Sequence, residues 1–303
     1  MTCTTKLYTG GQTAFIHGSD IHGKIIPGLG TSPDSCAGTI AGEIMDIYSK
    51  VMDFDRKERH YNPSNHPKTI FKRLDQVIAL DVDDTTADAI LSSSGFNLAF
   101  DAITGFRSQY TAELEIEQAN VIMGSSDPWQ SLKDFAYFSN YIELARTEFR
   151  GAGLKAGDTV LFLGSGPLPL SLIVLCQKHG LKGIGIEQEP DRAKLSRSVI
   201  ERLGLSDQIQ IIKGNHLTLP IEEPVDLVMV AAQAEPKDVI FDHLATVMPA
   251  GTKMSYRIYE KGLRRLLDTF SRYELPENLK EYRRIRPTPP ANNTSIFLSV
   301  VCA

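Results

Sequence analysis

The chain has 303 residues, of which 42% are hydrophobic and 23% charged, and its formal net charge at pH 7 is -5. These fractions are typical of a soluble globular protein of one or two domains, and the acidic balance argues against a nucleic-acid partner. The four cysteines form no C-x-x-C pair, and no apolar run is long enough to cross a bilayer. We therefore expect free cysteines, no membrane association and a cytoplasmic protein without a secretory leader.

The first half of the chain predicts helices. Residues 1–33 show no clear periodicity and are expected to be irregular, and His17 and His22 have no third residue with metal-ligand spacing. Apolar residues at helical spacing then predict helices near 35–54, 68–92, 107–123 and 129–149. Asp127 and Pro128 are suited to cap and open the last of these. We predict an N-terminal helical domain over residues 1–150.

One stretch of this half fits a different chemistry. Residues 76–88, QVIALDVDDTTAD, follow the apolar-strand-then-DxDxT pattern of aspartyl-phosphate phosphatases of the haloacid dehalogenase type. Asp81 would then be the nucleophile and Asp83 the acid. The alternative is an acidic helix turn or N-cap, which is favoured because the residues that follow lead into helices and not into that family's own sheet.

The second half of the chain alternates between strands and helices. Strands are predicted near 160–163, 183–187, 208–212, 225–231, 251–257 and 295–301, and helices near 169–180, 190–203, 236–247 and 260–273. Such alternation is typical of a parallel sheet covered by helices on both faces. We predict a Rossmann-like α/β domain over residues 151–303.

The stretch VLFLGSGPLPL, residues 160–170, predicts a buried strand that turns at glycines and leads into a helix. Glu187, which ends the next strand, is placed to accept hydrogen bonds from ribose hydroxyls. Asn215 could reach an adenine edge, and Ala231 leaves room for a ligand beside the sheet. The predicted cofactor-binding residues are Gly164, Ser165, Gly166, Pro167, Leu168, Glu187, Gln188, Asn215, His216 and Ala231.

Three features favour S-adenosylmethionine (SAM) over a dinucleotide as the ligand. Pro167 and Pro169 stand where a dinucleotide-binding helix would begin, and a late strand, TSIFLSVV, follows a long crossover as in SAM-dependent methyltransferase-type sheets. A dehydrogenase would also place its glycine fingerprint nearer the start of the chain.

Three segments resemble the nicotianamine synthase family and its bacterial relatives, the opine-metallophore (staphylopine-type) synthases. They are FLGSGPLPLSLIVL, FAYFSNYIELARTEF with Ala136 in place of the usual proline, and VMVAAQAEPKDVIFDHLATVMPAGTKMSYR, which ends at Arg257. The resemblance implies a helical domain that covers a SAM-binding domain. It also implies transfer of the 3-amino-3-carboxypropyl (aminobutanoyl) group of SAM to an amine, with release of methylthioadenosine. A single transfer to histidine is expected here over repeated condensation.

The same resemblance assigns the site. Glu115 and Tyr141 would be catalytic, and Glu113, Tyr137 and Arg257 would bind the amino-acid substrate, with no metal in catalysis. The register of AELEIEQ leaves Glu113 and Glu117 open as alternatives to Glu115. A neutral amine is the nucleophile, so a neighbouring carboxylate or phenol that takes its proton would assist.

Other functions remain open at this point. They are a nicotianamine synthase that condenses several SAM units, an ordinary SAM-dependent methyltransferase, the phosphatase using Asp81, and a SAM-sensing module without turnover. A homodimer is also left open.

Overall fold

The computed structural model describes residues 5–9, 12–16, 33–56, 66–93, 96–219, 224–268 and 274–302. The chain forms two compact units, Met1–Thr111 with Tyr259–Thr269, and Ala112–Ile258 with Phe270–Ala303. The division falls inside helix α4 (Phe96–Gly124) and not at residue 150, because the second half of α4 packs with the sheet. Tyr259–Thr269 also joins the first unit, which the sequence boundary did not anticipate.

The first unit contains a β-hairpin where irregular structure was expected. Strands β1 (Thr5–Thr9) and β2 (Gln12–Ile16) pair antiparallel, with Thr9 opposite Gln12. Two short runs separated by a Gly-Gly pair are a common hairpin pattern. The expectation for residues 1–33 was therefore wrong for these strands; His17 and His22 lie outside the described residues.

The predicted helices of the first unit are present, as α1 (Pro33–Arg56), α2 (Pro67–Ile78), α3 (Asp84–Leu91) and the start of α4. Their apolar faces meet in one core, to which the 3-10 helix η3 (Gly262–Leu267) contributes three buried leucines. The helix predicted over 260–273 is thus only this short turn in the described residues. Its leucines follow helical spacing, but they bury against α2 and α3 and not against the sheet.

The phosphatase interpretation of residues 76–88 is wrong. The apolar residues that would form its strand end α2, and Asp83 caps α3 by accepting hydrogen bonds from the Thr86 backbone N–H at 2.8 Å and the Thr86 hydroxyl at 2.9 Å. Asp81 lies exposed in the intervening turn. The alternative of an acidic helix cap is confirmed, since a capping aspartate needs no strand before it.

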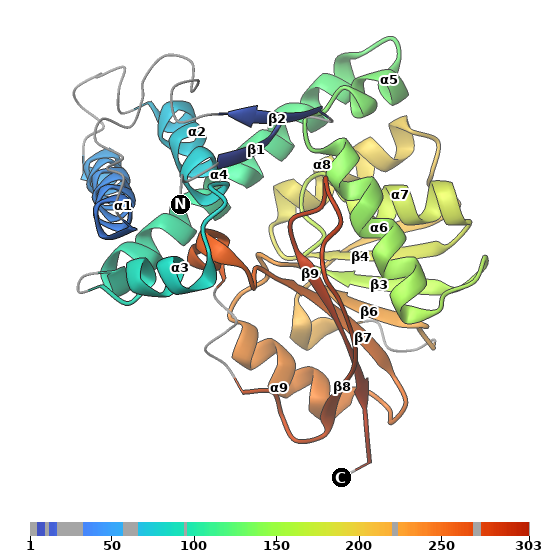
Figure 1. The fold of residues 1–303 in the computed structure, drawn as a ribbon. Helices are drawn as coiled ribbons and strands as arrows, with labels where there is room; N and C mark the ends of the chain where they lie inside the picture. The colour runs from blue at the N-terminus through green and yellow to red at the C-terminus, as the bar shows by residue number, and fades with distance from the viewer. Residues whose placement is uncertain are drawn as a thin grey trace. The chain divides into compact units, whose positions relative to one another are not determined.

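The second unit is built on a seven-stranded sheet with the order β5-β4-β3-β6-β7-β9-β8 (Figure 1). The five parallel strands are β3 (Thr159–Leu163), β4 (Lys182–Glu187), β5 (Ile209–Lys213), β6 (Leu227–Val230) and β7 (Lys253–Ile258). The antiparallel strand β9 (Thr294–Val300) lies between β7 and β8 (Leu279–Ile285). Six of these strands were predicted, whereas β8 was missed because its sequence, LKEYRRI, is mostly charged and exposed.

Helices cover both faces of this sheet, as the alternation predicted. α5 (Pro128–Lys133), α6 (Phe138–Ala152), α7 (Leu170–His179) and α8 (Pro190–Arg202) share one core with the end of α4, and α9 (Lys237–Val247) packs in the core of the opposite face. The single helix expected over 129–149 is interrupted at residues 134–137. No helix of the described ranges is both long and apolar enough to span a membrane.

The connections of β3 define where a ligand can bind. β3 is followed by β4 on one side, while β6 lies on its other side, so the strand order reverses at this strand. In open α/β sheets, ligands bind in the crevice outside the carboxyl ends of the strands at such a reversal. The glycine-rich turn after β3 stands at this point.

Candidate active site

The glycine turn (Gly164–Gly166) is held tightly against the neighbouring strand. Gly164 and Gly166 have φ angles of 77° and 75°, which L side chains rarely adopt. The backbone N–H groups of Gly164 and Ser165 both donate to the Ile186 carbonyl oxygen, at 2.9 and 3.0 Å. The Ser165 side chain is buried over Gly185, so it lies inside the turn.

Glu187 fixes the turn from the end of β4. It is 5% exposed, its Oε2 accepts a hydrogen bond from the Gly166 N–H at 3.0 Å, and its Oε1 accepts one from the Glu189 N–H at 2.9 Å. Each carboxylate oxygen can accept a second bond. Glu187 therefore has acceptor capacity left beside the turn, as its predicted role toward a ribose requires.

Glu115 approaches the same turn from α4. Its Oε2 lies 2.9 Å from the place that a Cβ on Gly166 would occupy, and its Oε1 accepts a long hydrogen bond of 3.4 Å from the Tyr141 hydroxyl on α6. Burial raises the pKa of Glu115 to about 8, and the negative charge of Glu187 adds to the increase, while the Tyr141 bond and Arg192 oppose it. A carboxyl group with such a pKa can take or give a proton near neutral pH.

The structure separates Glu115 from its sequence neighbours. Glu113 and Glu117 are exposed, whereas Glu115 is partly buried and turned toward the glycine turn. Tyr137, also predicted to bind substrate, immediately precedes α6 and packs edge-on against Phe135 at 5.4 Å between ring centroids.

The loop that follows β6 packs against the glycine turn at Gly164. The Ala231 N–H donates to the Leu163 carbonyl at 3.0 Å, which keeps the loop beside β3. A Cβ on Gly164 would lie 3.2 Å from the Ala231 Cβ and 3.1 Å from the Ala234 Cβ. The wall made by Ala231 and Ala234 therefore closes on Gly164 with little space to spare.

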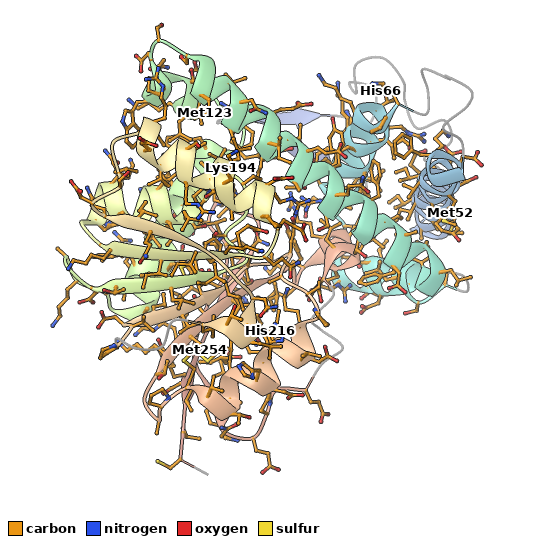
Figure 2. The ribbon with its side chains drawn as sticks, turned by 180° about the vertical axis from the view of Figure 1, so that it is seen from behind. Met52, His66, Met123, Lys194, His216 and Met254 are labelled. Atoms are coloured by element: carbon orange, nitrogen blue, oxygen red, sulfur yellow. The ribbon has the colours of Figure 1, made fainter. Side chains whose placement is uncertain are left out.

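The remaining predicted residues lie around this edge in different settings. Asn215 caps η2 (His216–Thr218), and its Oδ1 accepts from the Leu217 N–H at 2.9 Å. His216 is labelled in Figure 2. Its ring lies 5.7 Å from that of His243 on α9 between centroids, and burial lowers the pKa of His216. In the loop after the glycine turn Pro167 and Leu168 are buried, whereas Gln188 is exposed.

Arg257 is held in a buried polar network between α6, α7 and the sheet. Its Nε donates to Glu148 Oε1 at 3.1 Å and its Nη1 to Ser171 Oγ at 3.2 Å. Ser295 Oγ also donates to Glu148 Oε1, at 3.2 Å. Nη2 of Arg257 is buried with no hydrogen-bond partner among the described residues, so its two N–H groups remain for a ligand or a water.

Sequence reasoning missed three polar residues of this region. Glu148 is fully buried, Lys237 is 5% exposed, and the Asn140 Oδ1 atom is buried without a hydrogen-bond partner in the described part of the chain. Glu148 and Asn140 both lie in the Asn-Tyr helix motif, so that motif was the available pattern. Nothing in the sequence around Lys237 distinguishes it from an exposed lysine at a helix start.

The described residues contain no group of three or more His, Cys, Asp or Glu side chains placed to hold a metal ion. The site is instead a glycine turn, two unlike carboxylates, a tyrosine and a wall of alanines. A family model for nicotianamine synthase protein matches residues 34–302. The chain belongs to the nicotianamine synthase family.

Individual relatives from bacteria and plants match shorter parts of this chain than the nicotianamine synthase family model does. L-histidine 2-aminobutanoyltransferase of Yersinia pestis is 29% identical over 138 residues, 46% of this chain and 51% of that protein. Nicotianamine synthase 3 of Oryza sativa subsp. indica is 31% identical over 159 residues, 48% of this chain and 46% of that protein. The matched segments thus span about half the length of these curated relatives.

Solved structures of MtNAS resemble most of this chain. A variant of MtNAS in complex with S-adenosylmethionine is 28% identical and has a TM-score of 0.73, covering 86% of this chain and 98% of that one. MtNAS in complex with MTA and tNA is 29% identical, with the same TM-score and coverage. The predicted fold class, a Rossmann-like SAM-type sheet with a helical N-terminal region, is confirmed, with the β1–β2 hairpin as an addition.

Proposed function

We propose that this protein is an aminocarboxypropyl transferase that uses SAM as co-substrate and an amino acid as acceptor. The observation that carries the proposal is the Glu115 carboxyl group, which has a pKa of about 8, is hydrogen-bonded to Tyr141 and lies against Gly166. A methyltransferase-type sheet alone is compatible with several reactions. A proton acceptor beside the glycine turn is what amine alkylation at neutral pH needs.

In this reaction the neutral amine nitrogen of the acceptor attacks the carbon that joins the aminocarboxypropyl group to sulfur. A C–N bond forms, the C–S bond breaks with its electron pair going to sulfur, and methylthioadenosine leaves. The proton lost by the nitrogen passes to Glu115. The sulfonium activates each carbon bonded to sulfur, so the product depends on which carbon faces the amine.

The charge of the donor fits this role of Glu115. Without a ligand, burial and Glu187 keep the pKa of Glu115 near 8, so the carboxyl group is mostly protonated at pH 7. A sulfonium cation bound nearby would favour the carboxylate, because an opposite charge lowers the pKa of an acid. Binding of the donor would therefore prepare the base.

The predicted donor contacts have structural support of different kinds. Glu187 has acceptor capacity beside the turn for ribose hydroxyls, and Ala231 faces Gly164. The Nη2 group of Arg257 suits the carboxylate of an amino-acid group, because a guanidinium and a carboxylate form charge-assisted hydrogen bonds. We propose these contacts as the donor and substrate sites.

Histidine is the acceptor we propose, with one transfer per product, in the synthesis of an opine-type metallophore. The Yersinia pestis relative, named for L-histidine, supports this choice. The second candidate is repeated condensation of SAM units, supported by the rice relative and by the TM-score of 0.73 to MtNAS.

The test is mass spectrometry of the purified protein incubated with SAM alone and with SAM plus each of a panel of L- and D-amino acids. Methylthioadenosine with an acceptor heavier by one aminobutyrate unit supports the proposal and identifies the acceptor. Methylthioadenosine with condensed aminobutyrate units, formed from SAM alone, supports the second candidate. S-adenosylhomocysteine would indicate a methyltransferase and overturn both.

A further inference from the structure

Lys237 is a buried lysine that none of the catalytic or binding roles above uses. It is the first residue of α9, is 5% exposed, and belongs to the same compact unit as the glycine turn. A buried ammonium group is costly unless hydrogen bonds satisfy it. Its partners therefore indicate what it stabilises.

The ammonium group of Lys237 donates hydrogen bonds to the loop that follows β6. Nζ donates to the carbonyl oxygens of Ala231 at 3.2 Å, Ala232 at 2.8 Å and Ala234 at 2.6 Å. The Glu235 carboxylate is 3.5 Å away, and this side chain is 47% exposed. One side chain thus gathers three backbone carbonyl groups of a single short loop.

The gathered residues are the ones that face the glycine turn. Ala231 and Ala234 bring their methyl groups to within 3.2 and 3.1 Å of the place where Gly164 would carry a Cβ. Each carbonyl that Lys237 binds belongs to, or adjoins, one of these two residues. The ammonium group thus binds the backbone of the alanine wall, together with the Ala231 N–H bond to the Leu163 carbonyl.

Stability alone does not explain a lysine here. The amino end of a helix carries a partial positive charge, so a cation at the first helical position is unfavourable, and acidic residues are preferred there. A buried charge can also often be replaced by an apolar side chain without loss of stability. Departures of this kind from local preference concentrate at functional sites.

We propose that Lys237 is a positioning residue for the SAM donor. It holds the loop of residues 231–234 at a fixed distance from Gly164 and so sets the width of the donor site. This inference rests on the proposed use of SAM, and it concerns the binding of the donor, whereas Glu115 acts on the acceptor.

The experiment compares Lys237→Met with Lys182→Met, a control that removes an exposed lysine at the amino end of β4. Steady-state kinetics are measured with SAM and the acceptor varied separately, and circular dichroism checks folding. For Lys237→Met we expect the KM for SAM to rise about tenfold, with kcat and the acceptor KM within about twofold of the unsubstituted protein. The control should leave all three constants unchanged.

An unchanged KM for SAM in folded Lys237→Met protein would overturn the inference while leaving the transferase proposal intact. If the unsubstituted protein shows no turnover of SAM with any acceptor, the proposed function fails instead. Should Lys237→Met not fold, Ala234→Gly keeps the lysine and removes one methyl group of the wall. The inference then requires a raised KM for SAM in that variant, and an unchanged value would contradict it.

Discussion

Two glutamate side chains contact the glycine turn, Glu187 from the end of β4 and Glu115 from α4, and they differ in hydrogen bonding and in pKa. Glu187 accepts two backbone N–H bonds, at 3.0 and 2.9 Å, at the end of a parallel strand. Glu115 has one long bond of 3.4 Å to a tyrosine, and burial raises its pKa to about 8. Backbone donors stabilise a charged carboxylate, whereas desolvation favours the neutral acid.

The comparison indicates different roles for the two glutamates beside the glycine turn. A carboxylate with fixed N–H partners keeps its geometry and suits ligand binding. A carboxyl group such as that of Glu115, whose pKa lies near the working pH, suits proton transfer. Each of the following substitutions changes one side of this comparison.

The largest effect is expected for Glu115→Gln. The amide cannot accept the amine proton, so we expect kcat to fall about 10²–10⁴-fold with the KM for SAM nearly unchanged. Glu117→Gln, an exposed residue on the same helix, is the matched control. A Glu115→Gln variant with more than half of the original kcat would remove Glu115 from the mechanism.

The same variant has an opposite effect on stability. The folded-state pKa of Glu115, about 8, lies above the ordinary value of 4.5 for this side chain, so the folded protein loses stability as pH rises through this interval. Glu115→Gln removes that loss, and its Tm should exceed that of the unsubstituted protein above pH 8, by roughly 2 °C or more. At pH 4 the two Tm values should agree within error in calorimetry.

A smaller but still large effect is expected for Gly166→Ala. Its φ of 75° strains any side chain, and the new methyl group would also lie 2.9 Å from Glu115 Oε2. Gly153→Ala is a matched control, because Gly153 has a φ of 65° and open space around its Cβ position. Both variants should lose about 1 kcal/mol of stability, but only Gly166→Ala should also lose activity, by about 10²-fold. Equal activity losses in the two would mean that backbone strain alone explains the glycine.

Glu187→Gln should act mainly on the donor. An amide side chain can accept only one of the two N–H bonds, so we expect the KM for SAM to rise about tenfold. The negative charge of Glu187 raises the pKa of Glu115. Removing this charge should therefore lower that pKa, so the limb of the pH–kcat profile that rises with pH should move to lower pH. A limb that stays in place would show that the two carboxylates are not coupled.

Tyr141→Phe should have the smallest effect and should shift the profile in the other direction. The Tyr141 hydrogen bond lowers the pKa of Glu115, so its loss raises that pKa and moves the limb to higher pH. At pH 7 we expect kcat to fall about tenfold or less, with partial recovery as the pH rises. A loss that is the same at every pH would indicate that the hydroxyl group acts in another way.

The sequence by itself determined the sheet and the place of its ligand edge. Short apolar strands, the Gly-Ser-Gly turn and the acid at Glu187 are local sequence patterns. Parallel strands that are buried on both faces are encoded by such short apolar runs, so they can be predicted from the sequence. The Asp127 cap and the alternation of elements after Asp158 were confirmed for the same reason. Strand β8 escaped prediction because an exposed charged strand carries no apolar pattern.

Only the tertiary structure decided which residues meet. The choice among three glutamates on one helical turn depends on which of them faces the glycine turn, and their spacing leaves that undetermined. The Arg257–Glu148 pair joins residues 109 positions apart, and Lys237 became informative only through the loop carbonyls around it. Burial, and with it the pKa of about 8 at Glu115, arises from neighbours that are distant in sequence, so no local pattern could have predicted it.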